Sequence, residues 1–177
     1  MIILISGATH TGKTYLSQKL LEQLHYPCFS IDHLKMGLIR SGQTSLTPCD
    51  DEQLRDYLWP ILREMIKTAI ENRQNLIIEG DYIPFDWAED FEPDYCSHIC
   101  HLCLVMTERY IRTHFDRIRD YGSIIEQRMD DSDLTEEWLI EDNARNYREC
   151  VAHGCPMILI DENYDVTEKA GGILCPM

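Results

Sequence analysis

Eight consecutive residues near the start of the chain, Gly7 to Thr14, match the pattern G-x-x-x-x-G-K-T. The apolar run at residues 2–6 precedes them and predicts a buried β-strand, and residues 13–24 follow with the spacing of an amphipathic helix. This pattern wraps a phosphate group only where a strand leads into the loop and a helix leads out of it. The chain is therefore constrained to folds in which a strand delivers a phosphate-binding loop to the start of a helix.

The chemistry of this loop assigns roles to its side chains. Glycines let the backbone curl so that N–H groups point at phosphate oxygens, and the helix N-terminus adds partial positive charge. Lys13 is expected to bridge the β- and γ-phosphates, and Thr14 to place its hydroxyl on Mg²⁺. His10 is interpreted mainly as a residue of the loop tip. The predicted nucleotide contacts are Gly7, Ala8, Thr9, His10, Thr11, Gly12, Lys13, Thr14 and Tyr15.

Length and charge narrow the class of protein. The 177 residues, 44% of them hydrophobic, predict a single domain over residues 1–177. No apolar run reaches the length of a membrane span, and the first one lacks the basic flank of a signal peptide, so we expect a cytoplasmic protein without a membrane partner. The net charge of −15 argues against a nucleic-acid partner and means that an anionic substrate needs a local basic pocket.

Apolar runs alternate with helical patterns along the chain. Strands are expected at residues 2–6, 27–31, 75–79, 99–105 and 156–160, and helices at 13–24, 33–41, 50–72, 107–120 and 135–153. Such alternation predicts an α/β fold, a five-stranded parallel sheet between two layers of helices. Pro60 predicts a kink or a break in the helix over 50–72. Gly171 and Gly172 predict a weakly structured tail.

Two carboxylates follow predicted strands at the edge of the sheet where ligands of open α/β folds bind. Asp32 follows the second strand and is a candidate to orient or deprotonate an acceptor hydroxyl; alternatively it caps the helix that begins at His33. Glu79 ends the third strand, where it would organise Mg²⁺, so Thr14 and Glu79 are the predicted metal ligands. Asp81 is a weaker candidate for the same site.

Arginines are concentrated in the helix predicted over 107–120, and more occur in the helix over 135–153. Two helices joined by a charged loop are typical of a lid, placed here at about residues 113–135, whose arginines clamp phosphates and exclude water. The alternative is ordinary surface ion pairs, such as Asp116 with Arg119. The predicted catalytic residues are Lys13, Asp32, Glu79, Arg112 and Arg117, and Arg119 and Arg145 are predicted to contact the nucleotide.

Three of the eight cysteines, Cys96, Cys100 and Cys103, lie close together in the sequence. Their spacing raises the alternative of a zinc or redox sensor. The second half of this segment, however, is a predicted strand, on which successive side chains face opposite sides and do not converge on one metal ion. Buried thiols are therefore the favoured interpretation.

The early phosphate loop, Asp32, Glu79-Gly80 and the arginine-bearing lid together resemble the P-loop small-molecule kinases, a group that includes adenylate, shikimate, chloramphenicol and 2-phosphoglycerate kinase-like proteins. The resemblance spans most of the chain. It implies the strand order 2-3-1-4-5 and an adenine site near residues 161–166. Adenylate kinases carry Asp-Gly followed by Pro-Arg after the third strand. This chain lacks that arginine, which argues against a nucleoside monophosphate as acceptor.

The sequence therefore predicts a phosphotransferase that uses ATP and Mg²⁺ and transfers a phosphoryl group to a hydroxyl or phosphate group of a small-molecule acceptor, anionic or hydroxyl-bearing. ATP is favoured because the guanine-reading motif N-K-x-D does not occur in the sequence. The alternative is a nucleotide-binding switch or slow ATPase without an acceptor; no oligomeric state is predicted. Acceptor specificity is expected from about residues 33–59, with 82–90. The side chains concerned are Lys35, Arg40, Arg55, Tyr57, Trp59, Tyr82 and Trp87.

Overall fold

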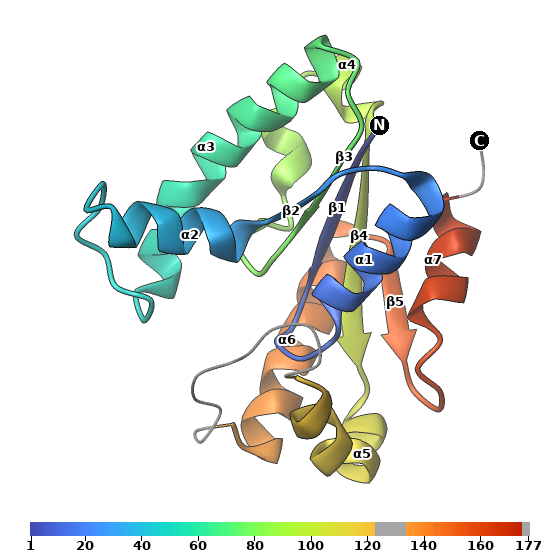
Figure 1. Ribbon diagram of the computed structural model, residues 1–177. Helices are drawn as coiled ribbons and strands as arrows, with labels where there is room; N and C mark the ends of the chain where they lie inside the picture. Colours follow the sequence, from blue (N-terminus) through green and yellow to red (C-terminus); the bar gives the residue numbers. More distant parts are fainter. Residues whose placement is uncertain (123–133, 175–177) are drawn as a thin grey trace.

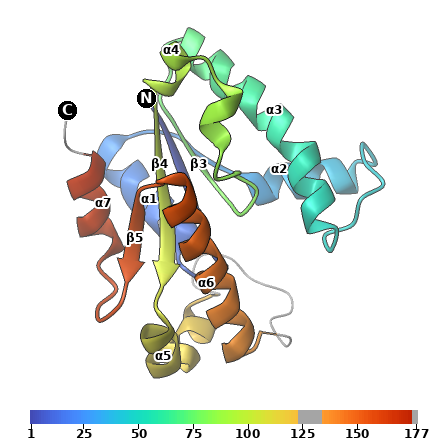
Figure 2. The same ribbon diagram turned by 180° about the vertical axis from the view of Figure 1, so that it is seen from behind.

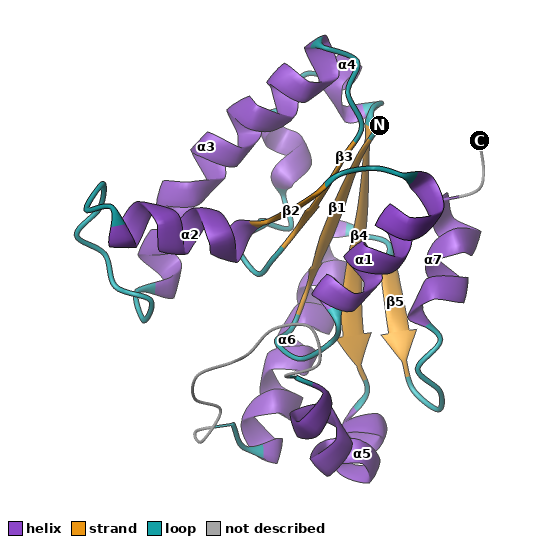
Figure 3. Ribbon diagram, in the orientation of Figure 1, coloured by secondary structure: helices purple, strands orange, loops and turns teal. Residues whose placement is uncertain are grey.

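A computed structural model of the chain describes residues 1–122 and 134–174. Its helices lie on both faces of a central sheet (Figures 1 and 3). The strands are β1 (Ile2–Gly7), β2 (Cys28–Ser30), β3 (Leu76–Glu79), β4 (Ile99–Met106) and β5 (Met157–Ile160). The helices are α1 (Lys13–Leu24), α2 (Ile31–Arg40), α3 (Asp51–Glu71), α4 (Pro93–Cys96), α5 (Glu108–Tyr121), α6 (Glu136–His153) and α7 (Val166–Leu174), with a 3-10 helix η1 (Trp87–Asp90).

The sheet is parallel throughout, with the order β2-β3-β1-β4-β5, which confirms the predicted fold class and strand order. Its register aligns Ser30 of β2 and Ile5 of β1 with Glu79 of β3. Parallel strands end at the same edge of a sheet, so the residues that follow β1, β2 and β3 come together there.

Two apolar clusters cover the two faces of the sheet. Ile3 and Ile5 of β1 pack with residues of α1, α5 and α7, whereas Ile2 and Leu4 pack with residues of α2 and α3. Figure 2 shows α3 and α6 in front of the sheet, on the face opposite to α1 and α7. Because β1 is covered on both faces, every one of its residues is buried, and its sequence is an apolar run rather than an alternation.

The structure corrects the predicted start of one helix and decides whether another is continuous. Helix α2 begins at Ile31 after an N-cap at Ser30, so Asp32 lies in its first turn. The interpretation of Asp32 as the cap of a helix that begins at His33 is therefore wrong. Helix α3 runs through Pro60 as a single helix.

The expectation of a weakly structured tail at Gly171 and Gly172 is also wrong, because both glycines lie within α7. Val166 and Ala170 of this helix are buried in the same cluster as β1 and β5. Tertiary burial of an apolar helix face outweighs the low helix propensity of two glycines.

About half of the predicted lid, residues 123–133, falls outside the described residues. Helices α5 and α6 flank residues 123–133, which include Arg128, so the lid stays a prediction. Among the helices of the described ranges, none combines the length and the apolar character needed to cross a membrane.

The cysteines close in sequence do not converge in space. Cys100 packs with the cluster on the α1 face, whereas Cys103 is buried on the opposite face with Cys150. Within residues 1–122 and 134–174, no group of three or more His, Cys, Asp or Glu side chains is arranged to hold a metal ion. This placement gives no support to the zinc-sensor alternative.

Candidate active site

The loop between β1 and α1 depends on two glycines whose φ angles are positive. Gly7 has φ of 138°, and a Cβ atom on it would lie 2.3 Å from the Leu104 carbonyl oxygen of the neighbouring strand β4. Gly12 has φ of 86°, and a Cβ atom there would lie 1.7 Å from the Tyr164 hydroxyl. Gly7 thus needs glycine for conformation and for space, because the clash is with backbone, whereas Gly12 needs it for conformation, and a larger residue there would displace the Tyr164 side chain. The Tyr164 hydroxyl in turn donates a hydrogen bond to the Thr11 carbonyl oxygen at 3.0 Å.

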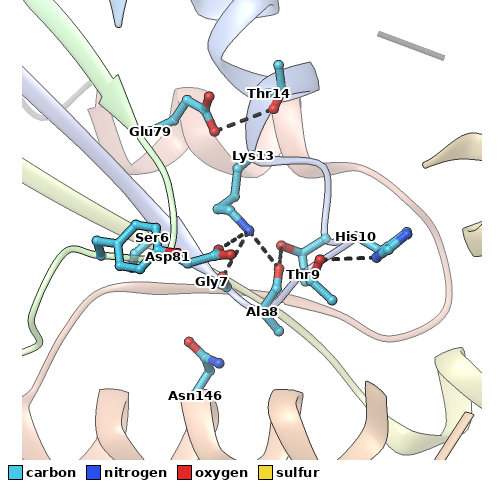
Figure 4. Close-up of polar contacts among 12 residues, drawn as sticks. Ser6, Gly7, Ala8, Thr9, His10, Lys13, Thr14, Glu79, Asp81 and Asn146 are labelled. Atoms are coloured by element: carbon cyan, nitrogen blue, oxygen red, sulfur yellow. Dashed lines mark hydrogen bonds and ion pairs between the residues drawn. The ribbon is translucent and has the colours of Figure 1, made fainter. Parts of the chain in front are cut away.

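Lys13, the first residue of α1, folds back over this loop (Figure 4). Its Nζ atom donates to the carbonyl oxygens of Gly7 at 3.0 Å and Ala8 at 2.9 Å. It also forms an ion pair with Asp81 Oδ1 at 2.6 Å. The Lys13 side chain is 9% exposed, whereas that of Asp81 is 51% exposed. The ammonium group is therefore held at the inner surface of the loop, and its partner is open to solvent.

Glu79 is the last residue of β3, and the sheet register delivers it beside the phosphate loop. The Thr14 hydroxyl donates to Glu79 Oε2 at 3.4 Å (Figure 4). Glu79 is 4% exposed. A hydroxyl and a carboxylate are oxygen donors of the kind that Mg²⁺ prefers, so Thr14 and Glu79 fit the metal role predicted for them.

Asp32 belongs to a network on the α2–α3 side of the loop. Its Oδ1 atom pairs with Lys35 Nζ at 2.6 Å, and Lys35 also donates to the Tyr82 hydroxyl at 3.1 Å. Tyr82 donates in turn to Asp51 Oδ1 at 2.8 Å. Burial alone would lower the pKa of Lys35, but Asp32 and Tyr82 outweigh it and raise the pKa. Burial, partly offset by Lys35, raises the pKa of Tyr82 to about 12.

One cavity of about 480 Å³ is lined by Lys13, Thr14, Asp32, Glu79 and Asp81. Its walls come from the phosphate loop, the starts of α1 and α2, the end of β3, helix α5 and the loop after β5. This combination of elements brings together residues that are up to 154 positions apart in the sequence, from His10 to Tyr164. The predicted site residues that line it are His10, Gly12, Lys13, Thr14, Tyr15, Asp32, Glu79 and Arg117.

The four arginines predicted to act in catalysis or nucleotide binding, Arg112, Arg117, Arg119 and Arg145, do not all line this cavity. Arg117 lines the cavity and also borders a second hollow. Arg112 lines the second hollow but not the cavity, and it pairs with Glu108 at 2.9 Å and with Glu136 at 2.6 Å. Arg119 forms an exposed pair with Asp116. Arg145 pairs with Asp142.

Asp142 is a contact of the phosphate loop that sequence reasoning missed. Its carboxylate is 8% exposed and accepts a hydrogen bond from the Thr9 backbone N–H at 3.1 Å. Asp142 thereby connects the loop to α6. Arg145 does not contact the loop through this network directly, but pairs with the carboxylate that does. No local pattern marks this aspartate, because the contact spans 133 residues.

A second missed group lies beneath the loop. His101 of β4 is buried, and its Nε2 atom is 2.7 Å from the Ser6 hydroxyl, one residue before the loop begins. Burial lowers the pKa of His101 to about 4, so the ring is neutral at pH 7. Trp87, a predicted contributor to acceptor specificity, packs edge-to-face against this ring. Trp59 is likewise buried, with its indole N–H donating to Asp90 at 2.7 Å.

Comparison with known proteins finds similarity in structure but not in sequence. No protein-family model matches the chain, and no curated protein sequence matches it.

Three solved structures of kinases share its architecture. A deoxyadenosine kinase from M. mycoides with bound dATP aligns with a TM-score of 0.58 at 17% identity, covering 98% of each chain. A gluconokinase from Sinorhizobium meliloti 1021 aligns with a TM-score of 0.56 at 12% identity, over 97% of this chain and 90% of that one. A shikimate kinase from Aquifex aeolicus aligns with a TM-score of 0.51 at 15% identity, over 96% and 92%. The chain therefore has the fold of the P-loop small-molecule kinases.

Proposed function

We propose that this protein is a phosphotransferase that moves the γ-phosphoryl group of ATP to a hydroxyl group of a small acceptor. The observation that carries the proposal is the single cavity into which Lys13, Thr14, Glu79 and Asp32 all open. The reaction breaks the bond between the γ-phosphorus and the β–γ bridging oxygen of ATP. It forms a bond from the acceptor oxygen to that phosphorus, and ADP and the hydroxyl proton leave.

The loop side of the cavity supplies the nucleotide site. Successive backbone N–H groups and the start of α1 stabilise phosphate charge, and Lys13 adds a full positive charge. Thr14 and Glu79 would hold Mg²⁺, which neutralises phosphate charge when it is bound. Of the four predicted site arginines, Arg117 of α5 lines the same cavity. We assign to it the stabilisation of charge on the transferred group.

The α2 side supplies the acceptor site. Lys35 contacts Oδ1 of Asp32, so we assign Oδ2 to the acceptor hydroxyl, where it would accept the hydroxyl proton in a hydrogen bond. Lys35 itself is matched by Asp32 and Tyr82. Because Lys35 does not line the cavity, it offers no positive charge to an acceptor bound beside Asp32, which favours a hydroxyl group over an anionic group at this position.

The test is ADP formation from Mg-ATP in the presence of a panel of acceptors, with Lys13→Ala as the control. The panel contains sugar acids, neutral sugars, shikimate, aminoglycosides, phosphoglycerates and nucleoside monophosphates. ADP formation that depends on one acceptor class and disappears in Lys13→Ala is the expected result. Slow ADP formation that no acceptor accelerates would contradict the proposal and favour the nucleotide switch.

A further inference from the structure

The Lys13–Asp81 ion pair places a carboxylate where a nucleotide phosphate is needed. The contacts of the Lys13 ammonium group within the described ranges include the carbonyl oxygens of Gly7 and Ala8 and the carboxylate of Asp81. The first two acceptors are carbonyl oxygens of the loop itself. The third is an anionic oxygen that comes from outside the loop, at 2.6 Å.

We propose that Asp81 is an internal competitor for the phosphate groups of the nucleotide. This inference rests on the proposed function and identifies a residue that sets the affinity of the same site. A phosphate oxygen that approaches Lys13 comes within a few ångströms of the Asp81 carboxylate. Two anions so close repel each other, so the carboxylate leaves the ammonium group when phosphate binds.

The structure provides room for this exchange. Asp81 is 51% exposed, so its carboxylate can turn into solvent without a cost of burial. Its neighbours are fixed: Glu79 ends β3, and Tyr82 is buried and bonded to Lys35 and Asp51. Only the Asp81 side chain then needs to rotate, and the backbone that carries Glu79 and Tyr82 stays in place.

The competitor also explains how Lys13 can stay over the loop without a ligand. A buried ammonium group with no anionic partner is unfavourable, and Asp81 supplies that partner in the ligand-free protein. The loop is therefore already assembled when a nucleotide arrives. The binding free energy is reduced because the Lys13–Asp81 pair must first be broken.

The test compares the affinity of Asp81→Asn and the unaltered protein for ADP and for inorganic tripolyphosphate, both in EDTA. Removing Mg²⁺ separates competition at Lys13 from any part that Asp81 has near a metal. We expect Asp81→Asn to bind both ligands about 3- to 10-fold more tightly, because the competing charge is gone. Asp81→Ala serves as a second variant, and thermal melting establishes that each variant is folded.

Glu162→Gln is the matched control for cavity charge, because Glu162 lines the same cavity but pairs with Arg109 instead of Lys13. This control is compared with tripolyphosphate only, since Glu162 lies in the region expected to hold the adenine, which tripolyphosphate lacks. Tighter binding in the Asp81 variants, clearly larger than in Glu162→Gln, supports the inference. Unchanged or weaker binding in folded Asp81 variants overturns it, and so does an equal gain in Glu162→Gln, which would indicate a general effect of cavity charge. If the unaltered protein binds neither ligand in EDTA and does not bind Mg-ATP when Mg²⁺ is restored, the proposed function itself is wrong; if it binds Mg-ATP but neither ligand in EDTA, Lys13 alone does not capture phosphate and the inference is overturned.

Discussion

The phosphate loop and the arginine-bearing helices α5 and α6 hold their charged groups in different ways. Lys13 is buried, and its anionic partner, Asp81, lies 68 positions away in the sequence. Arg112, Arg119, Arg145 and Arg148 are 50% to 64% exposed, and most of their partners lie within seven residues along the same helix. Burial and backbone geometry fix the first charge in one place. Exposed pairs contribute little to stability, so an arginine there needs a cavity contact before a catalytic role can be assigned to it.

The largest effect in this comparison is expected from Glu79→Gln, which removes the buried carboxylate on the loop side. The expected loss in kcat is roughly 10²- to 10³-fold at fixed Mg²⁺, because a preorganised charge in a water-poor site is hard to replace. Steady-state kinetics with the acceptor identified by the panel measure the loss. The control is Glu71→Gln on the exposed surface of α3, where the carboxylate accepts from Tyr95. A Glu79→Gln rate within threefold of the unaltered protein would show that this carboxylate does not organise the reaction.

A smaller effect separates two arginines of α5 that the sequence placed in the same role. Both arginines border the second hollow, but of the two it is Arg117 that also lines the cavity, whereas Arg112 is held by Glu108 and Glu136. We expect Arg117→Ala to lower kcat about tenfold and Arg112→Ala to lower it less than about twofold. The same kinetic assay measures both variants. A greater loss in Arg112→Ala than in Arg117→Ala would contradict the assignment and favour a closed lid that re-pairs Arg112.

The sequence was sufficient for features that depend on local order. The apolar runs of β1 and β4 and the helix periodicity of α1 identify elements directly, and the G-x-x-x-x-G-K-T pattern places Lys13 and Thr14. Helix α7 was missed because its stability comes from the burial of Val166 and Ala170, which two glycines conceal. Strand order followed from a resemblance, since no local pattern encodes it.

The parts of the candidate site that the sequence did not reveal depend on contacts between distant segments. Asp142 reaches Thr9 from α6, and Tyr164 reaches Thr11 from the loop after β5. Asp81 was visible as an acid after β3, but its pairing with Lys13 depends on the register of β1 and β3. Such contacts depend on packing geometry, which residue spacing alone does not specify.

The most direct test of the account is the binding of Mg-ATP to the unaltered protein and to Lys13→Ala, measured by calorimetry. Lys19→Ala is the control, because Lys19 lies on the same helix but is exposed and pairs with Glu22. The account predicts that Lys13→Ala weakens binding roughly 10- to 100-fold, as expected for the loss of a buried charge that contacts phosphate, while Lys19→Ala stays within about twofold. Equal affinity in the unaltered protein and Lys13→Ala, or no binding in any of the three, would contradict the central claim that this loop binds a nucleotide.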